Sequence, residues 1–332
     1  MNAGVLGTAD LLRRVRGGID VAGLRAEAKR PFRIFLCGDL SLVAELRSAL
    51  LRGYDGAAPA DAAATLETIF PGRPAVVTPE AKAVVFVGQP GDQEGADFGS
   101  LFALKLPIFS LVVHPDVVPS SPPSAPEAGK IGEYAVQALS HSALREGFFA
   151  HLVQVCSGSE VAVARRLLVL REFCAAKLTR DCSRRSLTIA AASAVLDHVP
   201  LAGLIIGPIA SAGDMVAITG LQMGLVLQIG ACYGRDPDLQ RVWELLPVVG
   251  GGFGWRALSR ELSGFIPVAG IAIKGAIAYA GTMVVGEGVT FYYEHGRQMS
   301  ATDASRLYEE AKASAMSLAR ELVAKFRNKK RD

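Results

Sequence analysis

The most restrictive feature of this chain is a stretch of twenty residues, 215–234, that carries no formal charge. A helix of that length spans about 30 Å, which is the thickness of the hydrocarbon core of a bilayer. Such a helix has no charged face to turn toward water, so lipid or other helices must cover it on all sides. The chain is therefore expected to contain a hydrophobic helical domain or to enter a membrane.

Two neighbouring segments share this character less completely. Segment 265–286 carries a single charge, Lys274, which would cost about 2.5–3.5 kcal/mol inside a bilayer unless it is paired or reaches the interface. Segment 187–212 is interrupted near Asp197 and Pro200. Two interpretations stay open: helices that insert into a membrane, which we favour, and a soluble bundle whose central helices are apolar all round.

Basic residues flank this apolar half. Segment 160–185 is expected to form a cationic helix with seven Lys or Arg against three acids, and the tail at 325–331 is also basic. In a membrane protein such segments stay on the cytoplasmic side and face anionic lipid. The net charge of the whole chain is only +3, which gives no electrostatic case for a nucleic-acid binder. We expect the cytoplasmic face of the inner membrane, with lipid contacts through 187–286.

Cysteine usage and the N-terminal segment indicate the same compartment. The five cysteines contain no CxxC pair and are odd in number, which is typical of free thiols rather than of a zinc site or a disulfide framework. Residues 1–30 are expected to form an amphipathic basic helix, and Arg13, Arg14 and Arg16 interrupt the apolar core that a signal peptide needs. We expect the chain to begin in the cytoplasm.

A different pattern begins at Pro31. Short apolar runs rich in Val, Ile and Phe alternate with helical stretches, as in parallel sheets whose strands are buried on both faces. The expected strands are 32–37, 75–77, 83–87 and 107–113, and the expected helices are 42–51, 60–69 and 143–155. A proline-rich loop follows at 117–130. The pattern predicts an α/β layer fold over 31–156 and a hydrophobic all-α domain over 157–332.

The first expected strand leads through Gly38 into a helix, which is the layout in which nucleotide-binding proteins place a phosphate loop. A loop of the form GxxxxGK[ST] needs a second glycine so that its amides wrap the phosphates, a lysine to neutralise them and a hydroxyl to hold Mg²⁺. Counted from Gly38, these places hold Val43, Ala44 and Glu45. All three requirements fail, and Glu45 adds negative charge where a phosphate would bind.

The segment RIFLCGDLSLVAELRSALL, which begins at Arg33, resembles the G domain of bacterial Ras/Era-like GTPases. The resemblance implies a Ras-like, P-loop-type sheet in degenerate form. The family's DxxG motif would fall on residues 77–80, which lack both the Asp and the Gly, and its NKxD motif on residues 113–116, which keep only the Asp. We predict a pseudo-GTPase with no catalytic residue, metal or cofactor. The alternative is weak GTP binding through Gly38, Asp39, Ser41 and Asp116.

The apolar half resembles the bacterial domain of unknown function 697. The matching stretches are DMVAITGLQMGLVLQIGACYGRD, which begins at Asp214, and FIPVAGIAIKGAIAYAGTMVVGEGVTFYYEHG, which begins at Phe265. That helical domain often follows a GTPase domain, and it also occurs in inner-membrane proteins. The order here, a G-like domain and then this domain, is the order that the family shows. The resemblance brings no catalytic residues.

Together these features predict a non-enzymatic, membrane-associated scaffold or adaptor. The pseudo-GTPase domain would dock a protein partner, and the helical domain would anchor the chain or join copies of it into an oligomer. Two alternatives stay open. One is an atypical GTP-binding protein whose nucleotide state is coupled to the helical domain, and the other is a wholly soluble interaction protein.

Overall fold

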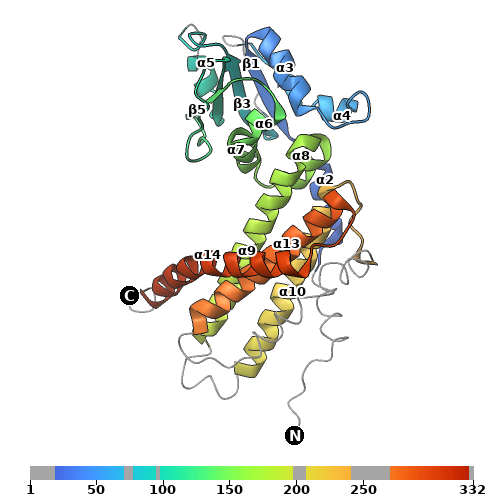
Figure 1. The fold of residues 1–332 in the computed structure, drawn as a ribbon, viewed down its shortest axis with the longest axis vertical. Helices are drawn as coiled ribbons and strands as arrows, with labels where there is room; N and C mark the ends of the chain where they lie inside the picture. Colours follow the sequence, from blue (N-terminus) through green and yellow to red (C-terminus); the bar gives the residue numbers. More distant parts are fainter. Residues whose placement is uncertain (1–18, 71–77, 95–97, 197–206, 241–269, 329–332) are drawn as a thin grey trace. The chain divides into compact units, whose positions relative to one another are not determined.

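The computed structural model describes residues 19–70, 78–94, 98–196, 207–240 and 270–328 (Figure 1). These residues divide into two compact units. The α/β unit comprises the described residues of 26–177 together with 232–234, and the helical unit comprises those of 1–25, 178–231 and 235–332. Helix α9, Arg171–Leu196, contributes its first residues to the α/β unit and the remainder to the helical unit.

In the described part of the α/β unit, five strands form one parallel sheet (Figure 1). The strands are β1 Arg33–Gly38, β2 Leu66–Thr68, β3 Ala81–Gly88, β4 Ile108–Val113 and β5 Ile131–Val136, in the order β2-β1-β3-β4-β5. The chain runs outward from β1 to β2 and then returns past β1 to β3, so the winding reverses between β1 and β3. The predicted α/β layer fold is confirmed.

Short helices and loops connect these strands. Helix α2 precedes β1, helices α3 to α5 lie between strands, and helices α6 to α8 follow β5. Their bounds are α2 Val21–Lys29, α3 Leu40–Leu50, α4 Ala60–Ala63, α5 Phe98–Phe102, α6 His141–Arg145, α7 Phe148–Val155 and α8 Glu160–Arg166, followed by the 3₁₀ turn η1 Leu168–Leu170.

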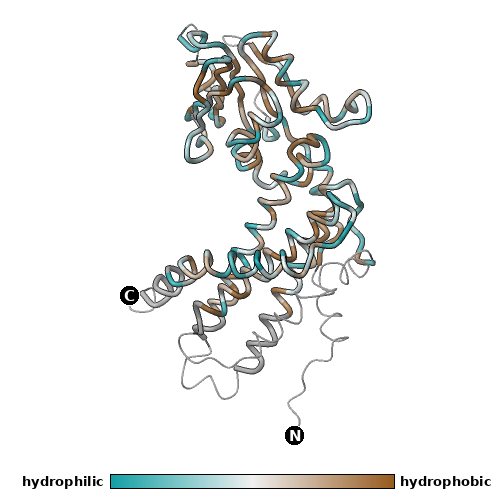
Figure 2. The backbone as a smooth tube through the Cα atoms, in the orientation of Figure 1, coloured by the Kyte–Doolittle hydropathy of each residue, from teal (hydrophilic) through white to brown (hydrophobic). Residues whose placement is uncertain are grey.

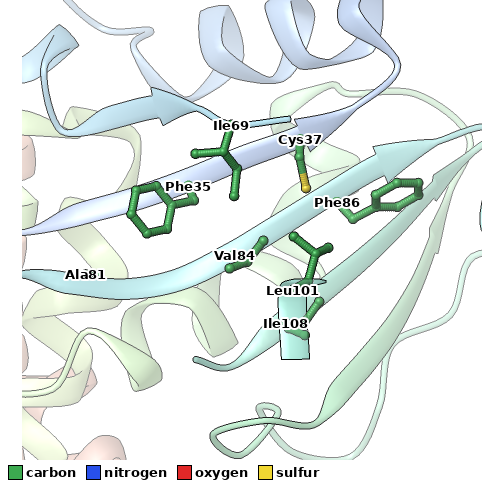
Figure 3. Close-up of a cluster of buried hydrophobic side chains, with 8 residues drawn as sticks. All are labelled: Phe35, Cys37, Ile69, Ala81, Val84, Phe86, Leu101 and Ile108. Carbon is green, nitrogen blue, oxygen red and sulfur yellow. The ribbon is translucent and has the colours of Figure 1, made fainter. Parts of the chain in front are cut away.

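One face of the sheet carries a cluster of buried apolar side chains from several strands. Leu101 of the short helix α5 lies over this face, and the partly buried Phe98 and Leu104 pack at its margin. Figure 3 shows the cluster with its eight members labelled: Phe35, Cys37, Ile69, Ala81, Val84, Phe86, Leu101 and Ile108. Because strands alternate their side chains, the intervening residues of the same strands serve the opposite face.

Three aromatic rings pack together on that opposite face. Phe109 of β4 stacks on Tyr134 of β5 with ring centroids 5.4 Å apart, and Phe148 of α7 meets both rings edge-on. All three side chains are at most 1% exposed. The strands are accordingly among the most hydrophobic segments of the unit, as Figure 2 shows. The sheet is therefore buried on both faces, as the continuous apolar runs predicted.

Segment 60–69 is not the single helix that was predicted. Helix α4 ends after one turn, and the next residues form β2, in which Leu66 pairs with Ile34 of β1. The strand buries Leu66 and provides hydrogen-bond partners for the outer side of β1, which a longer helix could not do. The predicted strand at 75–77 lies outside the described residues.

Two further predictions at the end of the sheet need correction. Strand β5 was not predicted, because an edge strand alternates buried and exposed residues and has no continuous apolar run. The predicted helix 143–155 is two helices, α6 and α7, which are separated at Gly147. Its φ of +98° lies in the left-handed region that favours glycine and ends α6. The predicted loop at 117–130 is confirmed.

Both outer edges of the sheet have partners for some of their backbone groups. At β5, Ser120 of the proline-rich loop exchanges two hydrogen bonds with Ala135, of 3.0 and 2.9 Å. At β2, the guanidinium of Arg47 donates to the carbonyl oxygens of Leu66 and Ala63. Arg47 belongs to α3, so a single side chain ties that helix to the edge strand.

The described part of the helical unit is built from long helices. Besides most of α9, these are α10 Gly207–Cys232, α13 Gly270–His295 and α14 Ala301–Asn328. Helices α13 and α14 pack along one another as a hairpin. The prediction that the C-terminal region is helical is confirmed.

Helix boundaries in this region differ from the predicted ones. The predicted helix 160–185 breaks at Leu167, whose backbone leaves the helical region at φ −115° and ψ 84°. Of segment 187–212, the structure describes residues 187–196, which belong to α9, and residues 207–212, which belong to α10. Residues Asp197 and Pro200 lie outside the described part of the chain. A search of the described helices finds no segment with the length and apolarity needed to span a membrane.

Candidate functional site

The carboxyl edge of the sheet, where doubly wound folds bind ligands, is the natural place to look for a site. We define this carboxyl edge as four segments, 38–42, 88–94, 113–119 and 136–142, each of which runs from the last residue of a strand into the loop or helix that follows it. The predicted residues Gly38, Asp39, Ser41 and Asp116 all lie here. The first three occupy the loop after β1, whereas Asp116 follows β4, with β3 between the two strands.

Gly38 has a structural role at the point where the winding reverses. Its φ is +118°, and a Cβ atom there would lie 2.0 Å from the carbonyl oxygen of Val87 in β3. The next amide, that of Asp39, donates to the same oxygen at 2.9 Å. Glycine is needed because the backbones of β1 and β3 approach each other closely.

Asp39 caps the helix that a phosphate loop would use to bind its anion. Its backbone is extended, and its Oδ1 accepts a hydrogen bond from the amide of Leu42 at 2.9 Å. The positive end of helix α3 is therefore complemented by the chain's own carboxylate. A phosphate at this place would compete for the same amide and would meet a like charge.

The next turn of α3 offers no replacement for the missing phosphate loop. Val43, which stands where the second glycine would be, is 4% exposed and packs into the core. Ala44, Glu45 and Ser41 are exposed to solvent. Helix α3 thus uses position 43 for packing, and at position 45, where a phosphate loop has its hydroxyl, it has an acid.

The loop after β3 adds two acids. Asp92 accepts a hydrogen bond from the amide of Gln89 at 2.7 Å, which closes a tight turn, and Glu94 is exposed. Between them, the side-chain amide of Gln93 donates to the hydroxyl of Ser110 at 2.6 Å. Ser110 is 1% exposed within β4, so this bond anchors the loop to the sheet.

The loop after β4 contains the remaining predicted residue. The amide of Asp116 donates to Nδ1 of His114 at 3.2 Å, while the carboxylate of Asp116 is 92% exposed. Two residues further on, Val118 is 81% exposed. Asp116 is therefore placed at the carboxyl edge on a local turn, and its carboxylate is open to solvent.

Residues 78–80, which were assigned to the last three positions of the DxxG motif, do not lie at the carboxyl edge. These residues stand immediately before β3. The amide of Ala81 donates to the carbonyl oxygen of Thr78 at 3.0 Å, and the amide of Arg33 donates to the carbonyl oxygen of Glu80 at 2.9 Å. They lie at the amino edge of the sheet, on the side opposite Gly38. Between β1 and β3, the strand that brings the chain to the carboxyl edge is β2, which the sequence pattern did not reveal.

Within the four described segments of the carboxyl edge, the formal charges have one sign. These segments contain four acids and no Lys or Arg. The acids are Asp39, Asp92, Glu94 and Asp116. Leu40 in the same segments is 60% exposed, so it and Val118 are the two most exposed large apolar side chains among the described residues. Sequence analysis missed Leu40, Asp92, Glu94 and Val118, although their positions directly after apolar strands were a usable signal.

Other polar groups of the α/β unit have structural explanations. The hydroxyl of Tyr134 lies 2.9 Å from Nδ1 of His151, and burial raises the pKa of Tyr134 and lowers the pKa of His151. Both groups are therefore neutral near pH 7 and form an ordinary buried hydrogen bond. Among the described residues, no cluster of His, Cys, Asp and Glu could hold a metal ion.

All five cysteines are free and buried. Burial raises the pKa of Cys37, Cys156 and Cys182 to about 12, which leaves almost no thiolate near pH 7. These thiols act as small apolar side chains rather than as nucleophiles. The interpretation of the cysteines as free thiols is confirmed.

A chain of buried polar side chains crosses the helical unit, and we call it the hydroxyl seam. Gln222 of α10 donates to the hydroxyl of Thr282 in α13 at 3.1 Å, and Thr282 lies 3.0 Å from the hydroxyl of Ser186 in α9. One turn further along α13, a Cβ atom on Gly286 would lie 2.3 Å from Oγ1 of Thr179 in α9. The seam joins three helices at close approach. It fixes their register and presents no group to solvent.

Comparison with protein-family models, with curated proteins and with solved structures found no match to this chain.

Proposed function

We propose that this protein is a non-enzymatic scaffold built on a pseudo-GTPase-like α/β unit. The observation that carries the proposal is the Asp39 cap on α3. Where a nucleotide-binding protein leaves helix amides open for phosphate, this chain places its own carboxylate on the amide of Leu42, 2.9 Å away. The surrounding loops add three more acids, so the local charge opposes every phosphate group of a nucleotide.

The scaffold function consists of docking a protein partner through the α/β unit while the helical unit associates with a membrane or with further copies of the chain. Support for the lipid contact comes from helix α9, where Arg180, Arg184 and Arg185 are exposed. Each basic residue near an anionic leaflet contributes about 1 kcal/mol. This arrangement would hold the chain at the cytoplasmic face of a bacterial inner membrane.

Nucleotide titration tests the non-enzymatic part of the proposal. Full-length protein is titrated calorimetrically with GTP and with ATP in the presence of Mg²⁺, and no heat of binding is expected up to about 100 µM nucleotide. An Asp39→Ser variant keeps the helix cap but removes the charge, and it should still fail to bind because the lysine and the second glycine are missing. Micromolar binding of GTP by the unmodified chain would replace the proposal with the atypical GTP-binding protein.

Vesicle flotation tests the membrane part. The full chain is mixed with vesicles of phosphatidylcholine alone or with added phosphatidylglycerol, and it should float only with the anionic vesicles. Replacing Arg180, Arg184 and Arg185 with Gln should abolish flotation, while the same change at the exposed Arg52, Lys105 and Lys130 of the α/β unit should not. A chain that stays at the bottom with both vesicles would instead favour the wholly soluble interaction protein.

A further inference from the structure

The exposed surface of the carboxyl edge combines two properties that a partner could use. The first is apolar exposure: Leu40, the first residue of α3, and Val118, in the loop after β4, are 60% and 81% exposed. The second is a charge of a single sign, since the four ionised side chains of this edge are all acidic. Exposed apolar side chains together with charges of one sign offer a partner both surface to bury and electrostatic complementarity.

We propose that the carboxyl edge docks a partner segment that is both positively charged and apolar, such as a basic amphipathic helix. This inference rests on the proposed scaffold function and names the chemistry of its partner. The basic residues of the segment would pair with Asp39, Asp92, Glu94 and Asp116. Its apolar residues would cover Leu40 and Val118.

Local hydrogen bonds hold this surface in place before any partner arrives. The Asp39 carboxylate is fixed by the amide of Leu42, and the Asp92 carboxylate by the amide of Gln89. Gln93 ties the second of these loops to the buried Ser110. Because the Asp39 and Asp92 carboxylates have little side-chain freedom left to lose, a partner that pairs with them gains more of the contact energy as affinity.

The opposite edge of the same sheet provides an internal comparison. Just before or at the amino ends of the strands the chain mixes both signs, with the bases Arg33 and Lys105, the acid Glu80, and an ion pair between Lys130 and Glu127 at 2.6 Å. Acids are therefore concentrated at the edge that carries the exposed Leu40 and Val118, and they do not simply reflect an acidic unit. A divalent cation is a poor alternative occupant, because the described residues contain no cluster that could hold a metal.

The test measures binding of a fluorescent probe peptide to the full chain by anisotropy in the absence of nucleotide. The probe is an idealised amphipathic helix of leucine and lysine, and its matched control replaces every lysine with glutamate. The leucine–lysine peptide should bind and the leucine–glutamate peptide should not. Binding should weaken as salt is added, since the charges are exposed.

Two sets of variants locate the binding surface. Asp39→Asn, Asp92→Asn, Glu94→Gln and Asp116→Asn together remove the charges, and the asparagine at position 39 keeps the helix cap. Their matched control neutralises four exposed acids elsewhere in the α/β unit: Asp55→Asn, Glu127→Gln, Glu133→Gln and Glu146→Gln. The first set should weaken binding at least tenfold, and the control set less than twofold.

A second pair of variants tests the apolar part. Leu40→Ser combined with Val118→Ser should also weaken binding at least tenfold, whereas Phe102→Ser, at another exposed apolar side chain on α5, should leave it unchanged. Circular dichroism establishes that each variant is folded. Equal binding by all variants, preference for the acidic peptide, or no binding by either peptide would overturn the inference. GTP binding would instead contradict the proposed function, and the two failures are measured separately.

Discussion

The two units of this protein are both rich in apolar residues, yet they are packed in different ways. The sheet of the α/β unit is covered by large side chains, and three of them, Phe109, Tyr134 and Phe148, form an aromatic cluster in which each ring contacts the other two. The helical unit instead brings backbones together over small and hydroxylated residues, as where Gly286 meets Thr179. Large side chains provide stability through buried area, whereas small ones do so through close contact between helices.

This difference determines how each unit responds to a change of volume. A core of large side chains tolerates exchange among similar residues, because total volume and pattern are kept. A close approach between backbones does not tolerate added volume, since there is no space even for one methyl group. Gly38 of the α/β unit is such a point, because an added Cβ would meet the backbone of Val87, and it lies within the carboxyl edge that forms the proposed docking surface.

The largest expected effect is on the stability of the α/β unit. It tests how much this stability depends on the close approach of β1 and β3 at Gly38. Gly38→Ala combines backbone strain at a φ of +118° with a contact of 2.0 Å to the Val87 carbonyl oxygen. The two costs, each about 1–3 kcal/mol, predict a loss of about 2–6 kcal/mol in the free energy of unfolding. Hydrogen exchange of peptides from β1 and β3 provides the measurement.

Gly91→Ala is the matched control for this change. Its φ of +95° is similar, but nothing lies within 4 Å of the added atom, so only the strain of about 1–3 kcal/mol remains. Equal losses at positions 38 and 91 would show that backbone conformation alone matters and that the strands do not approach as closely as described.

A smaller effect of the same kind is expected at the seam of the helical unit. An alanine at Gly286 would place its Cβ 2.3–2.8 Å from three atoms of Thr179, and rotation of that side chain cannot clear them all. Overpacking should lower the free energy of unfolding by about 1–3 kcal/mol, partly offset by the better helix propensity of alanine. Gly224→Ala on α10, where the space is open, should stabilise by about 0.5–1 kcal/mol. Urea unfolding monitored by exchange in α9 and α13 distinguishes the opposite signs.

The hydroxyl seam provides a third test, in which shape is kept and only polarity changes. Thr282→Val preserves volume but leaves Gln222 and Ser186 without their shared partner. The expected loss is about 1–3 kcal/mol, since buried polar groups are left unsatisfied. Ser314→Ala, which removes an exposed hydroxyl from α14, should change stability by less than about 0.5 kcal/mol. If both substitutions behave alike in urea unfolding, the seam has no special role.

The smallest effect concerns pH. Burial raises the pKa of Glu287 in α13 above its ordinary value of 4.5, Arg180 opposes the shift and Glu294 adds to it. A raised carboxyl pKa means that the folded state favours the neutral form, so this contribution to stability is complete below pH 4.5 and is lost as the pH rises through the folded-state pKa. Glu287→Gln should therefore stabilise the helical unit near neutral pH but not in acid. The measurement is the unfolding midpoint of the unmodified chain and of the variant from pH 4 to 8. A constant difference between the two midpoints over this range would contradict the prediction.

Much of the sheet was predictable because its strands are continuous apolar runs. Strands β1, β3 and β4 were predicted, whereas β2 was assigned to a helix because LET alone has no pattern, and only pairing with Ile34 makes it a strand. The Asp39 cap had a recognisable signal, an aspartate directly before a helix. The hydroxyl seam had none, because Ser186, Gln222 and Thr282 lie far apart in the sequence and acquire meaning only when three helices meet.

The partners at the outer edges of the sheet have a consequence for self-association. An open edge strand is a template on which another chain can add a strand and start a fibre. Here Ser120 occupies backbone groups of Ala135 on one side, prolines 119, 122 and 123 flank that contact, and Arg47 holds the Leu66 carbonyl on the other. Growth of this sheet by copying itself is therefore disfavoured at both ends. Copies of the chain would have to recognise one another through side chains rather than by adding strands to this sheet. The sheet edges are therefore distinct from the proposed docking surface.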